Sequence, residues 1–185
     1  MNIHALILAA GESKRLGQPK QLIDYQGKTL LAHVMSHLEP LATMTHVVLG
    51  AHEVTIKQNV VIKHPTTNPN WHQGMGNSLA FGINNLPDCD AVLVALCDQI
   101  FIPAGHFQQL INAAQTHPTH IIATQHKTCG VPAIFPAQFF KELAALTGDQ
   151  GAKAIITSHQ EQVKSITCQQ AAFDIDTPTD LLNLN

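Results

Sequence analysis

The polar residues between positions 11 and 20 are those of this chain best suited to chemistry. They follow an apolar run at residues 3–9 and include Gly11, Arg15 and Lys20. An apolar strand that opens into a glycine-bearing loop presents free N–H groups, and an Arg and a Lys add the positive charge that a polyphosphate needs. The stretch therefore predicts a nucleotide site at the end of the first strand, where open α/β sheets bind ligands. An ordinary strand-to-helix connection with a solvated basic surface is the alternative.

Two common phosphate-binding motifs do not fit this stretch. The Walker A motif needs four residues between its glycines and then Gly-Lys-Ser/Thr, whereas Gly11 and Gly17 are separated by five and Gln18 follows. The dinucleotide-binding pattern GxGxxG is also missing, and Lys20 comes too late for the P-loop lysine. The loop must therefore wrap its phosphates in a different way.

Aspartates form the second group of chemical interest. Asp98 follows a near-continuous apolar run at residues 90–97, the pattern of a central strand covered on both faces. An aspartate there is costly to bury unless it is hydrated, paired or bound to a metal ion. Asp174 and Asp176 share one side of the chain if it is extended, and Asp180 falls in the first turn of a terminal helix. Turns or helix caps formed by these aspartates are the alternative.

The opening of the chain resembles a known family. The stretch LAAGESKRLGQPKQL, followed by GKTLL at residues 27–31, is similar to the signature of the MobA-like nucleotidyltransferases, in particular their molybdenum cofactor cytidylyltransferase branch. The resemblance continues to the C-terminus. It implies an NTP-binding loop and a Mg²⁺ ion held by Asp98 and Asp176.

The resemblance also implies a set of site residues. The implied nucleotide-binding residues are Leu8, Ala9, Ala10, Gly11, Ser13, Arg15, Lys20, Gln73, Gly74, Gly76 and Ser78. The implied substrate-binding residues are Gly130, Gly151 and Lys153, and the implied catalytic residues are Arg15, Lys20 and Asp98. Physically, backbone groups and a hydroxyl at the start of a helix near Ser78 would read a base edge.

Three positions bear on specificity within the family. Ile100 stands where the family pattern Asp-Gln-Pro has proline, which affects loop rigidity more than the carboxylate. Lys153 replaces the arginine of Gly-Asp-x-Gly-Ala-Arg, which keeps the charge and loses the bidentate fork. Ala10 gives Ala-Ala-Gly at residues 9–11 instead of the Ala-Gly-Gly common in the guanylyl branch, and this favours CTP.

The implied activity is a Mg²⁺-dependent transfer of CMP from CTP to the phosphate of molybdopterin or the molybdenum cofactor, with release of pyrophosphate. A recipient molybdoenzyme or its chaperone is an implied further partner. One competing interpretation is a guanylyl- or sugar-phosphate nucleotidyltransferase of the same fold. Another is a carrier that binds nucleotide or pterin without doing chemistry.

Alternating strand and helix patterns must position these residues. They predict an α/β, Rossmann-like, doubly wound and mostly parallel sheet with helices on both faces, as one nucleotidyltransferase domain over residues 1–185. We expect strands at residues 3–9, 45–50, 60–63, 90–97, 120–124, 130–136 and 162–168, and helices at 29–39, 77–86, 103–117, up to 146 and from 177. Residues 64–78 are expected to form a long polar connection, in which Trp71 stacks on a base or pterin or caps the core.

Bulk composition excludes several classes of protein. Apolar residues make up 45% of the chain and charged residues 12%, which indicates a compact globule rather than disorder. A formal net charge of −3 argues against general nucleic-acid binding, which needs a clearly basic surface. The N-terminus lacks a cationic n-region and its apolar run is too short to span a membrane, so we expect a cytoplasmic protein without membrane contact.

Cysteines and histidines suggest no further chemistry. The chain has four cysteines, Cys89, Cys97, Cys129 and Cys168, without a C-x-x-C pair, so we interpret them as free thiols rather than zinc ligands or disulfides. His33 and His37 would share a helix face, but no third ligand lies at a recognisable spacing.

Overall fold

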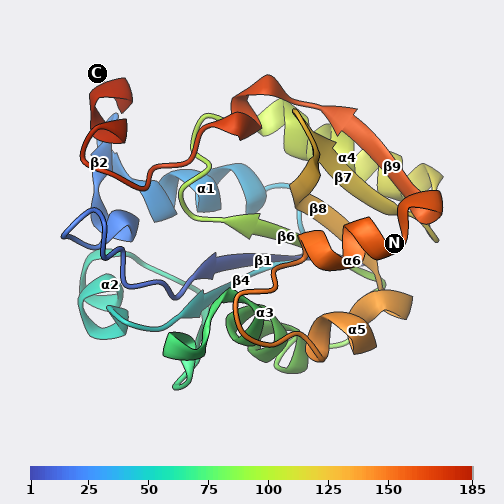
Figure 1. The fold of residues 1–185 in the computed structure, drawn as a ribbon, viewed down its shortest axis with the longest axis horizontal. Coiled ribbons are helices and arrows are strands. Elements are labelled where there is room, and N and C mark those ends of the chain that lie inside the picture. Colours follow the sequence, from blue (N-terminus) through green and yellow to red (C-terminus); the bar gives the residue numbers. More distant parts are fainter. Residues whose placement is uncertain (185) are drawn as a thin grey trace.

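The computed structural model describes residues 1–184, and a seven-stranded sheet forms its centre (Figure 1). The sheet strands are β1 (Ile3–Ala9), β4 (Met44–Leu49), β5 (His64–Thr67), β6 (Ala91–Leu96), β7 (Ile121–Gln125), β8 (Cys129–Pro136) and β9 (Val163–Thr167). They lie in the order β5-β4-β1-β6-β8-β7-β9, and β8 alone among them runs antiparallel to its neighbours. A separate hairpin pairs β2 (Asp24–Tyr25) with β3 (Lys28–Thr29). The predicted mostly parallel α/β sheet is confirmed.

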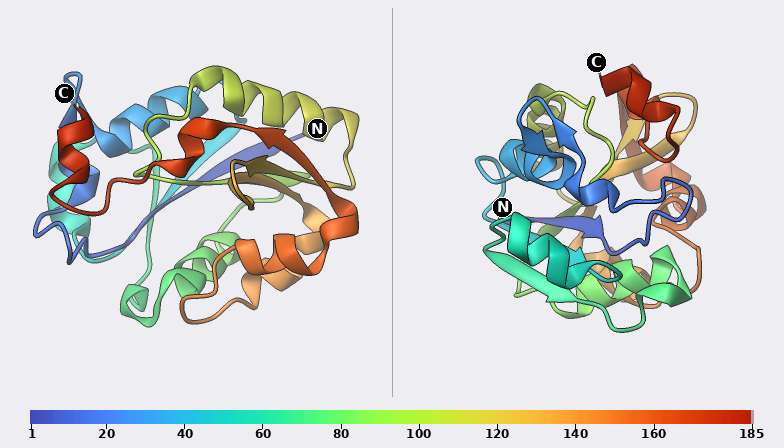
Figure 2. Two further views of the ribbon diagram at one scale, coloured as in Figure 1. Left: turned by 45° about the horizontal axis from the view of Figure 1, so that its top comes forward. Right: turned by 90° about the vertical axis from the view of Figure 1, so that its left-hand side faces the viewer.

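Helices cover both faces of this sheet. The α-helices are α1 (Leu30–Leu38), α2 (Glu53–Asn59), α3 (Met75–Asn84), α4 (Ala104–Thr116), α5 (Phe140–Ala144) and α6 (Lys153–Ser158). Short 3-10 turns are η1 (Lys20–Leu22), η2 (Trp71–Gln73), η3 (Ala137–Phe139), η4 (Gln160–Gln162), η5 (Gln169–Ala172) and η6 (Asp180–Leu184). Figure 2 shows α1 and α4 on one side of the sheet and α3, α5 and α6 on the other. No helix within residues 1–184 combines the length and the apolar character that crossing a membrane requires.

Side chains of β1 show why the sheet is covered twice. All seven residues of this strand are buried. Ile3, Ala5 and Ile7 pack under α1 and α4, whereas Leu6 and Leu8 pack under α3 and its neighbours. Because successive strand residues point to opposite faces, a strand between two helix layers needs apolar residues at nearly every position, and His4 is the one polar residue of β1.

One strand prediction and one loop prediction are wrong. The third strand is not at residues 60–63, since Val60 is the C-cap residue of α2 and Val61 is 90% exposed. The strand is β5, which lies inside the predicted long connection at residues 64–78, and that segment also contains η2 and the start of α3. β5 is polar and carries Pro65, which a strand tolerates because it lies at the sheet edge and pairs only with β4.

The remaining predicted elements are found within a few residues of their expected bounds. Thr29 begins α1 as predicted, and its side chain accepts a hydrogen bond from the Ala32 N–H at 3.2 Å. Pro103 precedes α4, and its fixed φ suits a helix start. Asp98 follows β6 directly, as the apolar pattern indicated.

A row of histidines crosses β1, β4 and β5 near the start of β1. The rings of His4 and His46 stack with centroids 5.3 Å apart, and the His64 ring lies 5.3 Å from that of His46. Burial, together with the neighbouring His4 and His64 rings, lowers the pKa of His46 to about 4. The folded protein therefore holds His46 neutral where an unfolded histidine is protonated.

We predict that this row makes the protein less stable in mild acid. The stability that depends on neutral His46 is complete above the unfolded pKa of about 6.5 and is lost as the pH falls toward 4. The loss should reach about 3 kcal/mol, measurable by urea unfolding at a series of pH values. A His46→Leu variant should show a shallower pH dependence between pH 7 and 4. An unchanged pH profile in that variant would contradict the assignment.

Gly50, directly after β4, fills a narrow space between two segments. A Cβ atom there would lie 2.5 Å from the Ala10 carbonyl oxygen and 2.6 Å from the Trp71 Cβ. The adjacent Ala51 N–H donates to the same Ala10 oxygen at 3.1 Å. The missing side chain thus lets the loop after β1 and the Trp71 turn approach each other.

Gly50→Ala should therefore destabilise the protein by roughly 1–3 kcal/mol through overpacking. The matched control is Gly105→Ala at an exposed position of α4, where an added Cβ meets nothing within 4 Å. That substitution should stabilise the protein by up to about 1 kcal/mol. Denaturant unfolding measures the change in the free energy of unfolding for both variants. Equal changes would show that close packing does not exclude a side chain at Gly50.

Candidate functional site

A cleft of about 490 Å³ opens at the carboxyl ends of β1 and β6. Ten of the nucleotide-binding and catalytic residues predicted from sequence line it: Leu8, Ala9, Ala10, Gly11, Ser13, Arg15, Lys20, Gly74, Ser78 and Asp98. Gly130, Gly151 and Lys153 instead line a second cavity of about 210 Å³. The two cavities share Leu8, Met75 and Leu96 as a common wall, so they form adjoining halves of one site.

Ser13 sets the shape of the loop between β1 and η1. Its φ of +59° is unusual for a residue with a side chain, and its carbonyl accepts from the Leu16 and Gly17 N–H groups at 3.0 and 3.2 Å. Its hydroxyl accepts from the Lys20 N–H at 3.2 Å. Gly17 has a φ of +73°, which glycine adopts without strain. The loop therefore closes on itself and fixes the backbone from which Lys20 projects.

Gln21 is a site residue that sequence reasoning missed. Its side chain is buried and donates to the carbonyls of Ala9 and Gly11 at 2.9 and 3.0 Å. These two bonds tie η1 to the end of β1 and hold both ends of the loop together. The only signal was a glutamine next to Lys20, and a polar residue in a polar loop gives no reason to expect burial.

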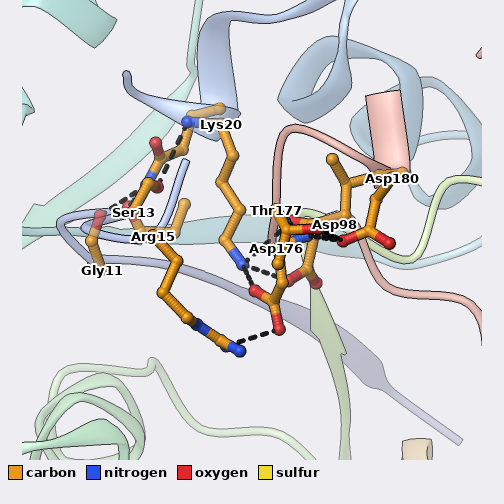
Figure 3. Close-up of polar contacts among 11 residues, drawn as sticks. Gly11, Ser13, Arg15, Lys20, Asp98, Asp176, Thr177 and Asp180 are labelled. Atoms are coloured by element: carbon orange, nitrogen blue, oxygen red, sulfur yellow. Dashed lines mark hydrogen bonds and ion pairs between the residues drawn. The ribbon is translucent and has the colours of Figure 1, made fainter. Parts of the chain in front are cut away.

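Four charged side chains converge beside the cleft (Figure 3). The Lys20 ammonium donates to Asp98 Oδ2 and, at 2.8 Å, to Asp176 Oδ1. Arg15 donates from Nη2 to the other oxygen of Asp176 at 2.9 Å. The structure therefore brings together the Arg, the Lys and both aspartates that the sequence indicated, from positions far apart in the chain.

Burial makes this network electrostatically strong. The Asp98 and Lys20 side chains are only 8% and 16% exposed. Burial alone would lower the pKa of Lys20, but Asp98 and Asp176 outweigh it and raise that pKa above its ordinary value. Partial burial would likewise raise the pKa of Asp176, yet Lys20 and Arg15 hold it below its usual range. Both groups therefore stay charged near neutral pH.

Asp180 positions the C-terminal part of the network. Its Oδ2 accepts from the backbone N–H groups of Asp176 and Thr177 at 3.1 and 2.7 Å, and from the Thr177 hydroxyl at 2.8 Å. Asp180 lies in the first turn of η6, as the sequence predicted. The turn it forms fixes the backbone of Asp176 opposite Lys20.

The Gln73–Ser78 segment has more packing contacts than the sequence suggested. A Cβ at Gly74 would lie 2.4 Å from the Gly148 carbonyl carbon, and one at Gly76 would lie 2.5 Å from the Gln150 oxygen. Both glycines therefore let α3 pack against the loop at 147–150. The Ser78 hydroxyl is buried and accepts from Asn68 Nδ2 at 3.1 Å. Gln73 and Gly76 do not line the cleft, and a role of this segment in reading a base stays a prediction.

The smaller cavity contains polar groups that the sequence did not single out. Gln99 and His126 line it, and Gln99 Oε1 and His126 Nδ1 are buried without a hydrogen-bond partner in the described part of the chain. Asp174 also lines it. Although its side chain reaches solvent, local loss of hydration and the nearby Asp98 and Asp176 carboxylates raise the pKa of Asp174 to about 6. This half of the site suits a ligand with hydrogen-bonding groups.

Oxygen atoms dominate the metal-binding potential of the site. Asp98 Oδ1 is buried and has no partner among residues 1–184, and Asp176 adds a second carboxylate close by. Such a donor set fits Mg²⁺, which takes one or two carboxylates and completes its shell with water and phosphate. The same residues include no cluster of three or more His, Cys, Asp or Glu side chains arranged around a metal position. The His33 and His37 rings pack edge to face, with centroids 4.7 Å apart.

Two known proteins are similar to this chain over nearly its whole length. The "Nicotine blue oxidoreductase" of Paenarthrobacter nicotinovorans is 27% identical over 205 residues, covering 98% of this chain and 96% of the relative. A "Probable molybdenum cofactor guanylyltransferase" of Carboxydothermus hydrogenoformans is 22% identical over 184 residues, covering 100% of this chain and 91% of the relative.

A solved structure extends the likeness to the fold. Rv0371c from Mycobacterium tuberculosis H37Rv superposes with a TM-score of 0.88 at 25% identity, covering 99% of this chain and 96% of that one. A complex of Rv0371C with manganese superposes with a TM-score of 0.83 at 22% identity, covering 100% and 98%. In sequence, residues 5–163 match the family described as the MobA-like NTP transferase domain. This match covers most of the chain, which therefore belongs to the MobA-like NTP transferase family.

Proposed function

We propose that the protein transfers CMP from CTP to the phosphate of molybdopterin or the molybdenum cofactor, with Mg²⁺, and releases pyrophosphate. The observation that carries this proposal is the convergence of Arg15, Lys20, Asp98 and Asp176 at the mouth of a cleft. Two cations suit a triphosphate and two carboxylates suit a divalent ion, as nucleotidyl transfer requires.

The larger half of the site takes the nucleotide in this proposal. Its volume of about 490 Å³ falls within the range of small-molecule pockets. Gly11 is exposed and a Cβ there would meet nothing within 4 Å, so the backbone after β1 is open to phosphate oxygens. Arg15 and Lys20 would neutralise charge that develops on the departing pyrophosphate.

Asp98 and Asp176 would hold the metal ion. Mg²⁺ bound there would supply positive charge that orients and polarises the α-phosphate. The unpartnered Asp98 Oδ1 is an oxygen suited to such an ion. The manganese complex of Rv0371C shows that a protein of the same fold binds a divalent cation.

The smaller cavity takes the acceptor. Gly130, Gly151 and Lys153 line it, and the lysine would attract the acceptor phosphate. An oxygen of that phosphate forms the new bond to the α-phosphorus while the bond to pyrophosphate breaks. A phosphate monoester is already anionic near neutral pH, so the step needs no general base. Positioning and charge neutralisation do most of the catalysis.

The choice of CTP rests on the loop after β1. Ala10 lines the cleft, and its methyl group would crowd a purine more than a glycine would. The Carboxydothermus relative is named a guanylyltransferase, which makes GTP the main competing substrate. Transfer to a sugar phosphate and a carrier role without catalysis compete with the proposal as well. The proposal further includes one domain over residues 1–185, a cytoplasmic location where nucleoside triphosphates are available, and a recipient molybdoenzyme or its chaperone as partner.

Pyrophosphate release tests the reaction directly. We expect Mg²⁺-dependent release from CTP only when molybdopterin or the molybdenum cofactor is present, and much slower release from GTP. Preference for GTP would move the protein to the guanylyl branch. Tight cofactor binding without release from any nucleoside triphosphate would favour the carrier.

Asp98→Ala and Asp98→Asn should reduce turnover by a factor of about 10²–10³ or more, because each removes charge next to the reacting phosphate. Asp88→Ala is the matched control, since Asp88 lies exposed before β6 and outside the cleft. Thermal unfolding of each variant separates lost chemistry from lost folding. Near-normal turnover in a folded Asp98→Asn protein would show that Asp98 is not a catalytic residue.

A further inference from the structure

The Lys20 ammonium is surrounded by oxygen atoms from distant parts of the chain. It pairs with Asp98 Oδ2, donates to Asp176 Oδ1 at 2.8 Å and donates to the Ile175 carbonyl at 3.4 Å (Figure 3). The pairing with Asp98 is sheltered, because neither side chain is more than 16% exposed. Lys20 thus serves as a cation held between two carboxylates.

A divalent cation bridging Asp98 Oδ2 and Asp176 Oδ1 would need the position that the Lys20 ammonium occupies. Mg²⁺ and similar ions bind carboxylate oxygens at roughly 2.0–2.6 Å, which is close to the distance from Lys20 Nζ to Asp176. Two positive charges in this sheltered gap would repel each other strongly. The lysine ammonium and the metal ion therefore exclude each other from the position between the carboxylates.

Lys20 can leave this position by moving its side chain alone. Its backbone is fixed at both ends, because its N–H donates to the Ser13 hydroxyl at 3.2 Å and its carbonyl accepts from the Ile23 N–H at 3.2 Å. The four-carbon stem remains free to rotate. Lys20 also lines the cleft together with Gly11 and Arg15, where phosphate oxygens would receive its ammonium.

We propose that the Lys20 ammonium competes with the divalent cation for the position between Asp98 and Asp176. The ammonium leaves this position only when a triphosphate draws it into the cleft. Metal alone then binds weakly, and metal and triphosphate bind together. Asp180 accepts from the Asp176 N–H at 3.1 Å, so the Asp176 backbone keeps its place when Lys20 moves. The inference rests on the proposed function in assuming that the triphosphate and the metal meet at this site.

The test measures Mn²⁺ binding to the full chain without any nucleotide, by electron paramagnetic resonance of free Mn²⁺. Lys20→Met and Lys20→Gln both remove the charge, and Gln retains a donor for the carboxylates if Met impairs folding. We expect either variant to bind Mn²⁺ about tenfold more tightly than the wild type. A charge next to a carboxylate changes its affinity for a cation by about one log unit or more. Lys14→Met is the matched control, because Lys14 is 80% exposed on the same loop and pairs with Glu12 instead. It should keep the wild-type affinity.

Adding Asp98→Asn to Lys20→Gln locates the bound ion and should abolish the gain. Unchanged or weaker Mn²⁺ binding in both Lys20 variants, or a gain that survives Asp98→Asn, would overturn the inference. Pyrophosphate assays on the wild type distinguish the two proposals. Tighter Mn²⁺ binding by the Lys20 variants without any pyrophosphate release by the wild type would contradict the proposed reaction and support the competition. Pyrophosphate release by the wild type without tighter Mn²⁺ binding by the variants would support the reaction and contradict the competition.

Discussion

The contact of Lys20 with Asp98 and Asp176 is the interaction on which the site depends. It joins the loop after β1, the end of β6 and the C-terminal segment, which are otherwise separate in sequence. Removing one partner of a buried ion pair typically costs about 3–5 kcal/mol, because the other charge is left unpaired. Asp98 meets that condition with 8% exposure, whereas Asp176 is 37% exposed and is held partly by Asp180. The same contact therefore supports the fold and gathers the charged groups.

Local patterns predicted those parts of the structure that local physics decides. The doubly covered strand β1, the Thr29 cap and the placement of Asp98 after β6 follow from apolar runs and capping chemistry, which need no knowledge of the rest of the chain. The β1 loop could be identified for the same reason, since glycine and cations directly after a buried strand form a local signal. Family resemblance, rather than spacing, indicated that Asp176 lies near Asp98, and the ion pair of Asp176 with Arg15 was not predicted.

Features that depend on tertiary contacts could not be predicted in this way. The sequence of β5 is typical of a loop because it is polar and contains Pro65. Only its edge position beside β4 allows it to form a strand. Gln21 is buried because its amide donates to the carbonyls of Ala9 and Gly11, which lie 12 and 10 residues earlier in the chain. Gly74 resembled a residue of close ligand approach, yet the close approach in the structure is to the loop at Gly148. A glycine indicates that something comes near, and only the fold shows what it is.

The reversed strand β8 explains how one sheet edge carries a site with two halves. In a parallel sheet, only the carboxyl ends of strands and the loops after them reach that edge. Because β8 runs antiparallel between β6 and β7, its start at Cys129 and Gly130 lies at the carboxyl ends of both neighbours. The turn between β7 and β8 therefore adds His126 and Gly130 to the cavity that Asp174 also lines. Reversing one strand places the second cavity directly beside the cleft of the β1 loop, where two ligands can meet across the shared wall at Leu96.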